Sequence, residues 1–164
     1  MNPIAWFSNL PPELATFILS MLPITELRAS IPIALEVYDL PVVNTWLIAV
    51  AGNMFPTAII LYFIPFVHEW VIRKRLFGGF LTKILKQAEK KFSGNFAKYG
   101  AIGLVIFVGI PLPFTGAWTG ALAAFVFNIP FKKAFLLILA GVCLAATAVT
   151  AITLFAGGAL RWLL

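Results

Sequence analysis

The chain has 164 residues, of which 62% are hydrophobic, 15% aromatic and only 11% charged. A soluble domain carries about 25% charged residues, so this composition excludes a water-exposed globular surface, and the length allows one domain. The formal net charge is +6. Eight of the 12 basic residues lie between Arg73 and Lys98, flanked by apolar segments. This placement favours anionic lipid headgroups over nucleic acid as the partner.

Three long stretches carry no charged residue: Leu40 to Val67, Tyr99 to Phe131, and Ala134 to Leu160. Each exceeds the roughly 20 residues that a helix needs to cross the hydrocarbon. Backbone groups in lipid must be satisfied within the segment, which favours helices. The sequence therefore predicts an all-α polytopic protein of the cell (inner or plasma) membrane.

The first repeat, about residues 11–67, predicts two short helices, a turn and one full transmembrane helix. The first short helix runs from Glu13 to Leu22, and Pro23 interrupts it. The second runs to about Tyr38, and an Asp-Leu-Pro turn follows it. The full span is predicted from Val42 to Val67, because its length and apolar character suffice to cross the bilayer.

Residues 68–98 predict an amphipathic helix that lies flat on the cytoplasmic membrane surface. Its lysines occupy much of the face left by the apolar residues, and such helices bind anionic headgroups. The positive-inside rule makes this linker cytoplasmic. The apolar residues that recur at helical spacing are Leu76, Phe77, Phe80, Leu81, Ile84, Leu85, Ala88 and Phe92.

The second repeat, about residues 99–160, predicts the same order of elements. A short apolar helix from Tyr99 is broken at Pro111-Leu112-Pro113, and a second short helix ends near Phe127. An Asn-Ile-Pro turn then echoes the Asp-Leu-Pro turn of the first repeat. The second full span is predicted from Ala134 to Leu160.

The two repeats align at an offset of 89 positions. Six of the 19 positions from Ala34 to Gly52 are identical to the residue 89 positions later. The identities include Pro41 with Pro130 and Gly52 with Gly141, which are harder to attribute to composition than Ala or Leu matches. We interpret the alignment as an internal duplication.

The half-length helices can be interpreted in two ways: as a hairpin that re-enters the membrane, or as one broken helix that crosses it. If Tyr99–Phe127 re-enters, Lys132 and Lys133 return to the cytoplasm with the basic linker, as the positive-inside rule favours. The two repeats are then inverted, and the hairpin tips near Glu26 and Thr115 approach each other from opposite faces. Inverted repeats with broken helices are typical of alternating-access transporters.

Glu26 and Arg28 are the candidate functional pair, because charges inside a membrane are costly and mark transport pathways or proton relays. An unpaired carboxylate in a low dielectric has a raised pKa, and a neighbouring Arg28 would lower it again. A structural ion pair or an interfacial position is the alternative interpretation. The full set of predicted substrate-binding residues is Glu26, Arg28, Pro32, Pro111, Pro113, Thr115 and Trp118.

An enzyme is not expected. The chain has one histidine and one cysteine, no paired metal-ligand spacing, and no Ser/His/Asp set or P-loop. We therefore predict no catalytic residues, no metal and no cofactor.

Two segments resemble motifs of the small multidrug export protein family. Glu26–Ala34 (ELRASIPIA) is similar to its ELRxxIPxA stretch, and Gly109–Gly120 (GIPLPFTGAWTG) to its second motif. The family is similar to the wider DedA group, which has opposed re-entrant hairpins and is associated with lipid movement, including polyprenyl-phosphate carriers, and with proton-dependent drug tolerance. The resemblance implies that Glu26 and Arg28 correspond to the acidic and Arg residues near those hairpins. The second hairpin here lacks the Arg of many DedA members.

The predicted function is a proton-coupled membrane transporter of a lipid-linked phosphate, polyprenyl-phosphate-like, or of a small amphiphilic compound. Two alternatives stay open. An exporter of small cationic drugs would depend on Glu26 and Trp118, and a non-transporting membrane scaffold would tolerate loss of Glu26 and Arg28. The sequence also leaves open whether the chain forms a homo-oligomer.

Overall fold

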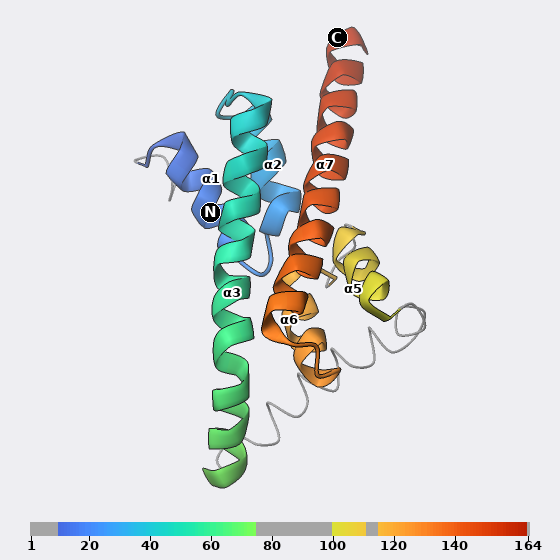
Figure 1. Cartoon of the computed structure of the whole chain (residues 1–164). Helices are drawn as coiled ribbons and strands as arrows, with labels where there is room; N and C mark the ends of the chain where they lie inside the picture. The colour runs from blue at the N-terminus through green and yellow to red at the C-terminus, as the bar shows by residue number, and fades with distance from the viewer. Residues whose placement is uncertain (1–9, 75–99, 111–114, 164) are drawn as a thin grey trace. The chain divides into compact units, whose positions relative to one another are not determined.

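The computed structural model describes residues 10–74, 100–110 and 115–163 (Figure 1). All regular secondary structure in these residues is helical, which confirms the predicted all-α class. The helices are α1 (Pro12–Met21), α2 (Glu26–Glu36), α3 (Val42–Lys74), α5 (Gly100–Gly109), α6 (Ala117–Val126) and α7 (Phe131–Leu163).

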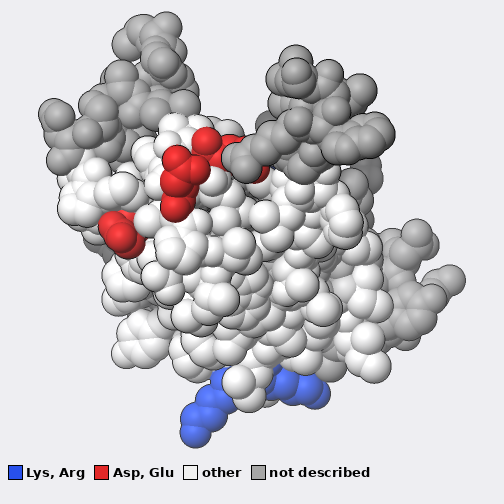
Figure 2. Space-filling view, turned by 90° about the horizontal axis from the view of Figure 1, so that it is seen from above, with Lys and Arg blue, Asp and Glu red and all other residues white. Residues whose placement is uncertain are grey.

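Two of these helices are long and apolar enough to cross a membrane. The spans Val42–Phe66 in α3 and Phe131–Ala156 in α7 have mean hydropathies of 2.0 and 2.5. Most of the described surface on the face drawn in Figure 2 carries neither acidic nor basic side chains. This distribution suits a protein whose long helices contact lipid rather than water.

The ends of both long helices differ from the sequence-based expectation. α3 continues without a break from Val67 to Lys74, where a new helix was predicted to begin at residue 68. α7 begins at Phe131 rather than Ala134, so Lys132 and Lys133 lie in its first turn. The first helical hydrogen bond of α7 runs from the Ala134 N–H to the Pro130 carbonyl at 2.9 Å. Proline can take this place because it lacks an N–H but keeps its carbonyl acceptor.

Several predicted features lie outside the described residues. Residues 75–99 carry most of the predicted amphipathic linker, and residues 111–114 include the predicted site residues Pro111 and Pro113. The predictions for these segments stay predictions.

The turns before the two long helices have matching geometry. Asp39 has φ 50° and Asn128 has φ 53°, and Asp and Asn tolerate this left-handed region better than most residues. The Thr45 N–H donates to the Pro41 carbonyl at 2.9 Å, as the Ala134 N–H does to Pro130. Both predicted turns are therefore confirmed, with the same backbone conformation.

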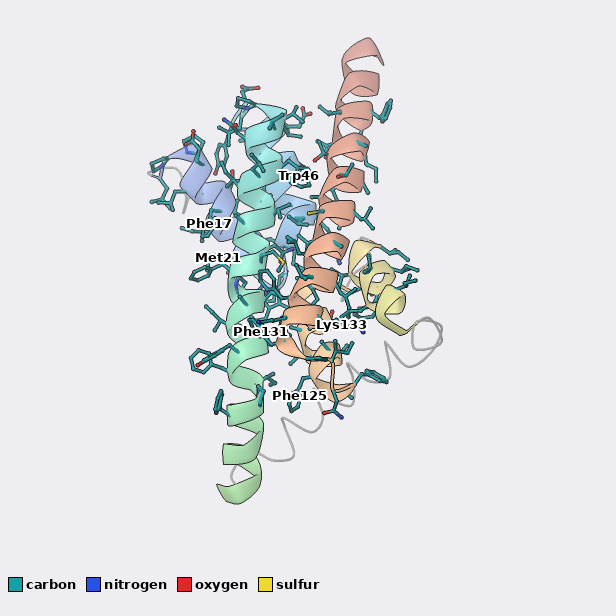
Figure 3. All side chains as sticks on the ribbon, in the orientation of Figure 1. Phe17, Met21, Trp46, Phe125, Phe131 and Lys133 are labelled. Atoms are coloured by element: carbon teal, nitrogen blue, oxygen red, sulfur yellow. The ribbon has the colours of Figure 1, made fainter. Side chains whose placement is uncertain are left out.

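The chain divides into two compact units. The first unit combines Met1–Asn53 with Ala146–Leu164, and thus holds α1, α2, the beginning of α3 and the later part of α7. Within it, α1 lies directly against α3 at Gly52, where an added Cβ would meet the Phe17 carbonyl oxygen at 2.5 Å. Figure 3 labels Phe17 and Met21 on α1, beside α3.

The second unit is Met54–Ala145, with α5, α6, the later part of α3 and the beginning of α7. Here α5 lies against α7 at Gly141, where an added Cβ would be 2.8 Å from the Val105 carbonyl oxygen. Gly120 of α6 is equally close to α5, since its added Cβ would be 2.6 Å from Val108 Cγ2. The fully buried side chains of this unit include Leu104, Phe107 and Ile138.

Candidate functional site

The break between α1 and α2 is short and held by local hydrogen bonds. Leu22 ends α1 in an extended conformation, with ψ 137°, and the next residue, Pro23, cannot donate a helical hydrogen bond. The Thr25 hydroxyl donates to the Leu19 carbonyl at 2.5 Å, and the Glu26 N–H donates to the Leu22 carbonyl at 3.0 Å. These bonds close the turn and place Glu26 at the first position of α2.

Glu26 combines a buried side chain with an unusual backbone conformation. Its φ is 44°, in the left-handed region that non-glycine residues rarely adopt, and the residue is only 9% exposed. Such conformations cost on the order of 1–3 kcal/mol and cluster at functional sites. The hydrogen bonds of the turn therefore hold the backbone of Glu26 in a conformation that a glutamate rarely adopts.

The predicted partner, Arg28, lies beside it. Arg28 Nη2 is 3.6 Å from Glu26 Oε2, with the two side chains 27% and 11% exposed. Burial raises the pKa of Glu26 to about 7, although Arg28 acts to lower it. α2 is not one of the two membrane-spanning helices, so this carboxyl belongs to the break rather than to a span. Burial and the neighbouring guanidinium thus act on the pKa of this carboxyl in opposite directions.

Small polar side chains lie between α1 and α2. The Ser20 and Ser30 hydroxyls hydrogen-bond to each other at 2.6 Å, joining α1 to α2, and Ser20 Oγ also lies 2.9 Å from the Thr16 carbonyl oxygen. All three residues are fully buried. The two short helices thus meet through satisfied hydroxyls, which keeps the loop that carries Glu26 fixed.

Pro32, another predicted site residue, lies half-buried inside α2. A proline has no N–H, so Pro32 cannot donate to the carbonyl of Arg28, four residues earlier. The ELRxxIP spacing therefore changes the helical hydrogen bonding at the same turn that carries the ion pair.

The break between α5 and α6 holds the remaining predicted residues. The Thr115 hydroxyl donates to the Ile110 carbonyl at 3.0 Å, and the Gly116 N–H donates to the Thr119 hydroxyl at 3.0 Å. Thr115 and Trp118 are half-buried. In its described residues this break carries no charged side chain, so it offers hydroxyls and an aromatic ring but no titratable group.

A metal site is not found among the described residues. No group of three or more His, Cys, Asp or Glu side chains could hold a metal ion in the part of the chain that the structure describes. At Glu26 the structure brings together a buried carboxyl group and the guanidinium of Arg28, 3.6 Å apart.

A second polar feature escaped the sequence-based prediction. The Trp46 indole N–H donates to the Thr147 hydroxyl at 3.2 Å, and both residues belong to the first unit. These residues are 101 positions apart, so no local pattern pairs them. A signal was nevertheless present, because Thr147, Thr150 and Thr153 recur every three residues in an otherwise apolar segment.

Comparison with known proteins gives one family. Residues 26–148 match the family described as "Putative small multi-drug export protein". No curated protein and no solved structure has a significant match to the chain. The match begins at Glu26, the first residue of α2, includes the break between α5 and α6, and covers most of the chain. With its two candidate spans, this membrane protein belongs to the small multi-drug export protein family.

Proposed function

We propose that this protein is a proton-coupled exporter of small amphiphilic compounds and that Glu26 is its proton-exchanging carboxylate. The observation that carries this proposal is the buried Glu26, held in a left-handed conformation with Arg28 Nη2 at 3.6 Å. The name of the family supports export of small molecules.

The coupling follows from the balance of forces on Glu26. Burial favours the neutral carboxylic acid, and Arg28 favours the carboxylate. When the guanidinium binds an acceptor group of a substrate, its pull on the carboxylate weakens and Glu26 takes up a proton. When the substrate leaves, Arg28 attracts the carboxylate again and the proton is released. Proton and substrate are then bound and released together, so efflux is driven by a proton gradient in the same direction, as in vesicles that are more acidic inside than outside.

The fold that we propose for this mechanism has two inverted repeats with re-entrant hairpins. α1, α2, α5 and α6 have 10, 11, 10 and 10 residues, so each is about 15 Å long, half of the roughly 30 Å hydrocarbon core. α3 and α7 have 33 residues each and begin 89 positions apart. The resemblance to the DedA group supports the same arrangement, with residues 68–98 in the cytoplasm.

A lipid-linked phosphate is a second candidate substrate, favoured by the partial exposure of Arg28. Its side chain is 27% exposed, and a guanidinium matches the geometry of a phosphate through two parallel hydrogen bonds. This substrate would use the same proton exchange at Glu26.

Transport in reconstituted vesicles tests the proposal. Vesicles with an imposed pH gradient are loaded with a neutral probe, N-phenyl-1-naphthylamine, or a cationic probe, ethidium, and internal pH is followed with pyranine. Glu26→Gln keeps the shape of the side chain and should abolish both the pH dependence of efflux and the coupled proton flux. Glu13→Gln, at an exposed position of α1, is the matched control and should transport normally.

Normal pH-dependent efflux by the Glu26→Gln protein would show that Glu26 is structural. Efflux of ethidium alone would replace the proposed substrate with a small cation. Absence of efflux of either probe by the unaltered protein, together with movement of a lipid phosphate, would favour the second candidate.

A further inference from the structure

An open apolar groove lies on the first unit, between the start of α3 and the later part of α7. Its volume is about 520 Å³, and its walls include Val43, Trp46 and Leu47 from α3 and Thr150, Ala151 and Leu154 from α7. We refer to it as the lateral groove. Pockets for small molecules measure about 300–1,000 Å³, so the lateral groove has the size of a small-molecule site.

The lateral groove is lined by exposed apolar residues of the two candidate spans. Val43 is 69% exposed and Leu47 55% exposed, and exposed apolar residues on a membrane-spanning helix face lipid. None of its lining residues is charged. A charged ligand would lose its hydration there without gaining a partner, so the groove favours an uncharged ligand that arrives from the lipid phase.

Thr150 lines the groove and has a hydroxyl group that makes no hydrogen bond within the described part of the protein. Two other buried threonines donate to the carbonyl four residues earlier: Thr153 to Val149 at 2.9 Å, and Thr16 to Pro12 at 2.7 Å. The Thr150 hydroxyl has no hydrogen-bond partner, although the residue is only 7% exposed. A rotation of roughly 120° around its Cα–Cβ bond moves the hydroxyl to another staggered position, from which we expect it to reach a ligand in the groove.

The Trp46–Thr147 hydrogen bond forms a second polar point on the same groove. It joins α3 to α7 at 3.2 Å, and Figure 3 shows Trp46 on the side of α3 that faces α7. The indole thus presents a large apolar surface to the groove while its N–H is held at the wall. Aromatic surface with a few placed polar groups is the usual composition of a ligand pocket.

We infer that the lateral groove binds one small uncharged amphiphile from the lipid phase, with its apolar body against Trp46 and Leu154 and a hydrogen-bonding group at Thr150. A saturated acyl chain has no group that could satisfy the Thr150 hydroxyl, which is costly to leave unpaired. Binding at this site does not require Glu26, so the inference stands apart from the proposed proton coupling.

Photolabelling of the full chain in phosphatidylcholine nanodiscs tests this inference. The probe is a neutral aryl amine with a diazirine, and mass spectrometry maps the labelled residues, with unlabelled N-phenyl-1-naphthylamine as competitor. We expect competable labelling on residues 42–47 and 147–154. Ala151→Trp fills the groove and should abolish it, while Ile152→Trp, at a 62% exposed neighbouring position, should not change it.

Loss of the hydroxyl should weaken probe binding by about five- to tenfold in Thr150→Val, the effect of one hydrogen bond. Thr150→Ser keeps the hydroxyl and should bind as the unaltered protein does. Elution as a single species and an unchanged Tm show that each variant is folded. Labelling should be the same in Glu26→Gln, whatever that variant does to transport.

Three outcomes would overturn the inference. In the first, a phosphatidylcholine with a diazirine on its acyl chain labels the groove and the amine does not compete, so that a lipid occupies it. In the second, cysteines at Leu47 cross-link between two copies and exclude the probe, so that the groove is a contact between copies. In the third, Ala151→Trp leaves probe labelling unchanged.

Discussion

Gly52 and Gly141 make the same kind of contact in the two units. An added Cβ on Gly52 would be 2.5 Å from the Phe17 carbonyl oxygen, and one on Gly141 would be 2.8 Å from that of Val105. The two glycines are 89 positions apart and their carbonyl neighbours 88. Each long helix thus approaches the backbone of a short helix at the corresponding turn, which is where small residues permit close helix packing.

Alanine at either glycine should therefore destabilise the protein. A Cβ closer than van der Waals contact to a backbone carbonyl forces the two helices apart, and such overpacking costs about 1–3 kcal/mol. Gly52→Ala and Gly141→Ala should both lower Tm in detergent. Gly109→Ala is the control, because its Cβ would first meet Leu144 Cβ at 3.3 Å, and its Tm should change less. Equal effects at all three positions would contradict the role assigned to the backbone contact.

Glu26→Gln should stabilise the fold in a pH-dependent manner. Burial raises the pKa of Glu26 from 4.5 to about 7, so the folded state binds the proton more tightly than the unfolded state. The stability that this proton gives is fully present below about pH 4.5 and is lost as pH rises through about 7. The variant should thus unfold at the same temperature as the parent near pH 4.5 but at a higher temperature at pH 8.

The expected gain at pH 8 is about 3 kcal/mol, because the two pKa values differ by about 2.5 and each tenfold change in proton affinity is worth about 1.4 kcal/mol. Scanning calorimetry in detergent at pH 4.5 and pH 8 measures this gain. Glu13→Gln is the control, and its Tm should differ from that of the parent by the same amount at both pH values. A Glu26→Gln protein that is less stable at pH 8 than its parent would show that the ion pair with Arg28 outweighs burial.

Arg28→Lys should separate the two candidate substrates. Lysine keeps the positive charge but loses the planar fork that binds a phosphate through two hydrogen bonds. Transport of a lipid phosphate should fall about tenfold or more, the loss of one charge-assisted hydrogen bond. Efflux of N-phenyl-1-naphthylamine, which has no phosphate, should fall much less, because lysine keeps the positive charge and can still donate a single hydrogen bond. Both are measured in vesicles at one pH, and a selective loss of cation transport would exclude both proposed substrates.

Accessibility of introduced cysteines tests the proposed topology. Cys143→Ala removes the single native thiol, and cysteines are then placed at Ser93 in the basic linker or at Asn2. With the linker cytoplasmic and both ends of the chain outside, a membrane-impermeant maleimide should label Asn2→Cys in intact cells and Ser93→Cys only after permeabilisation. Labelling of both from one side would overturn the inverted arrangement.

Local signals in the sequence predicted most of the helix boundaries. Pro23 marks the break after α1, and the Asp-Leu-Pro and Asn-Ile-Pro triplets mark the turns before α3 and α7, where Asp39 and Asn128 take left-handed conformations. These breaks and turns depend on the backbone sterics of a few neighbouring residues, so the local sequence is enough to predict them. The predicted span begins three residues after the start of α7, because the prediction followed the uncharged stretch from Ala134 and left out Lys132 and Lys133.

The candidate site was predicted only in part, because its decisive features arise from tertiary contacts. The Glu26–Arg28 pair was expected from sequence spacing, but the left-handed φ of Glu26 has no local signature. Trp46 and Thr147 meet because two distant helices pack together, and nothing in either segment specifies that pairing. Thr150 reads as an ordinary threonine until its missing helical hydrogen bond is seen.

The composition of the first unit has a consequence for biosynthesis. α1, α2 and the beginning of α3 leave the ribosome early, whereas the segment of α7 that completes this unit begins at Ala146. Gly52 can pack against Phe17 as soon as the start of α3 is made, but the wall of the lateral groove formed by Thr150 and Leu154 is absent until α7 is made. The lateral groove therefore cannot form until the whole of the second unit, Met54–Ala145, has been synthesised.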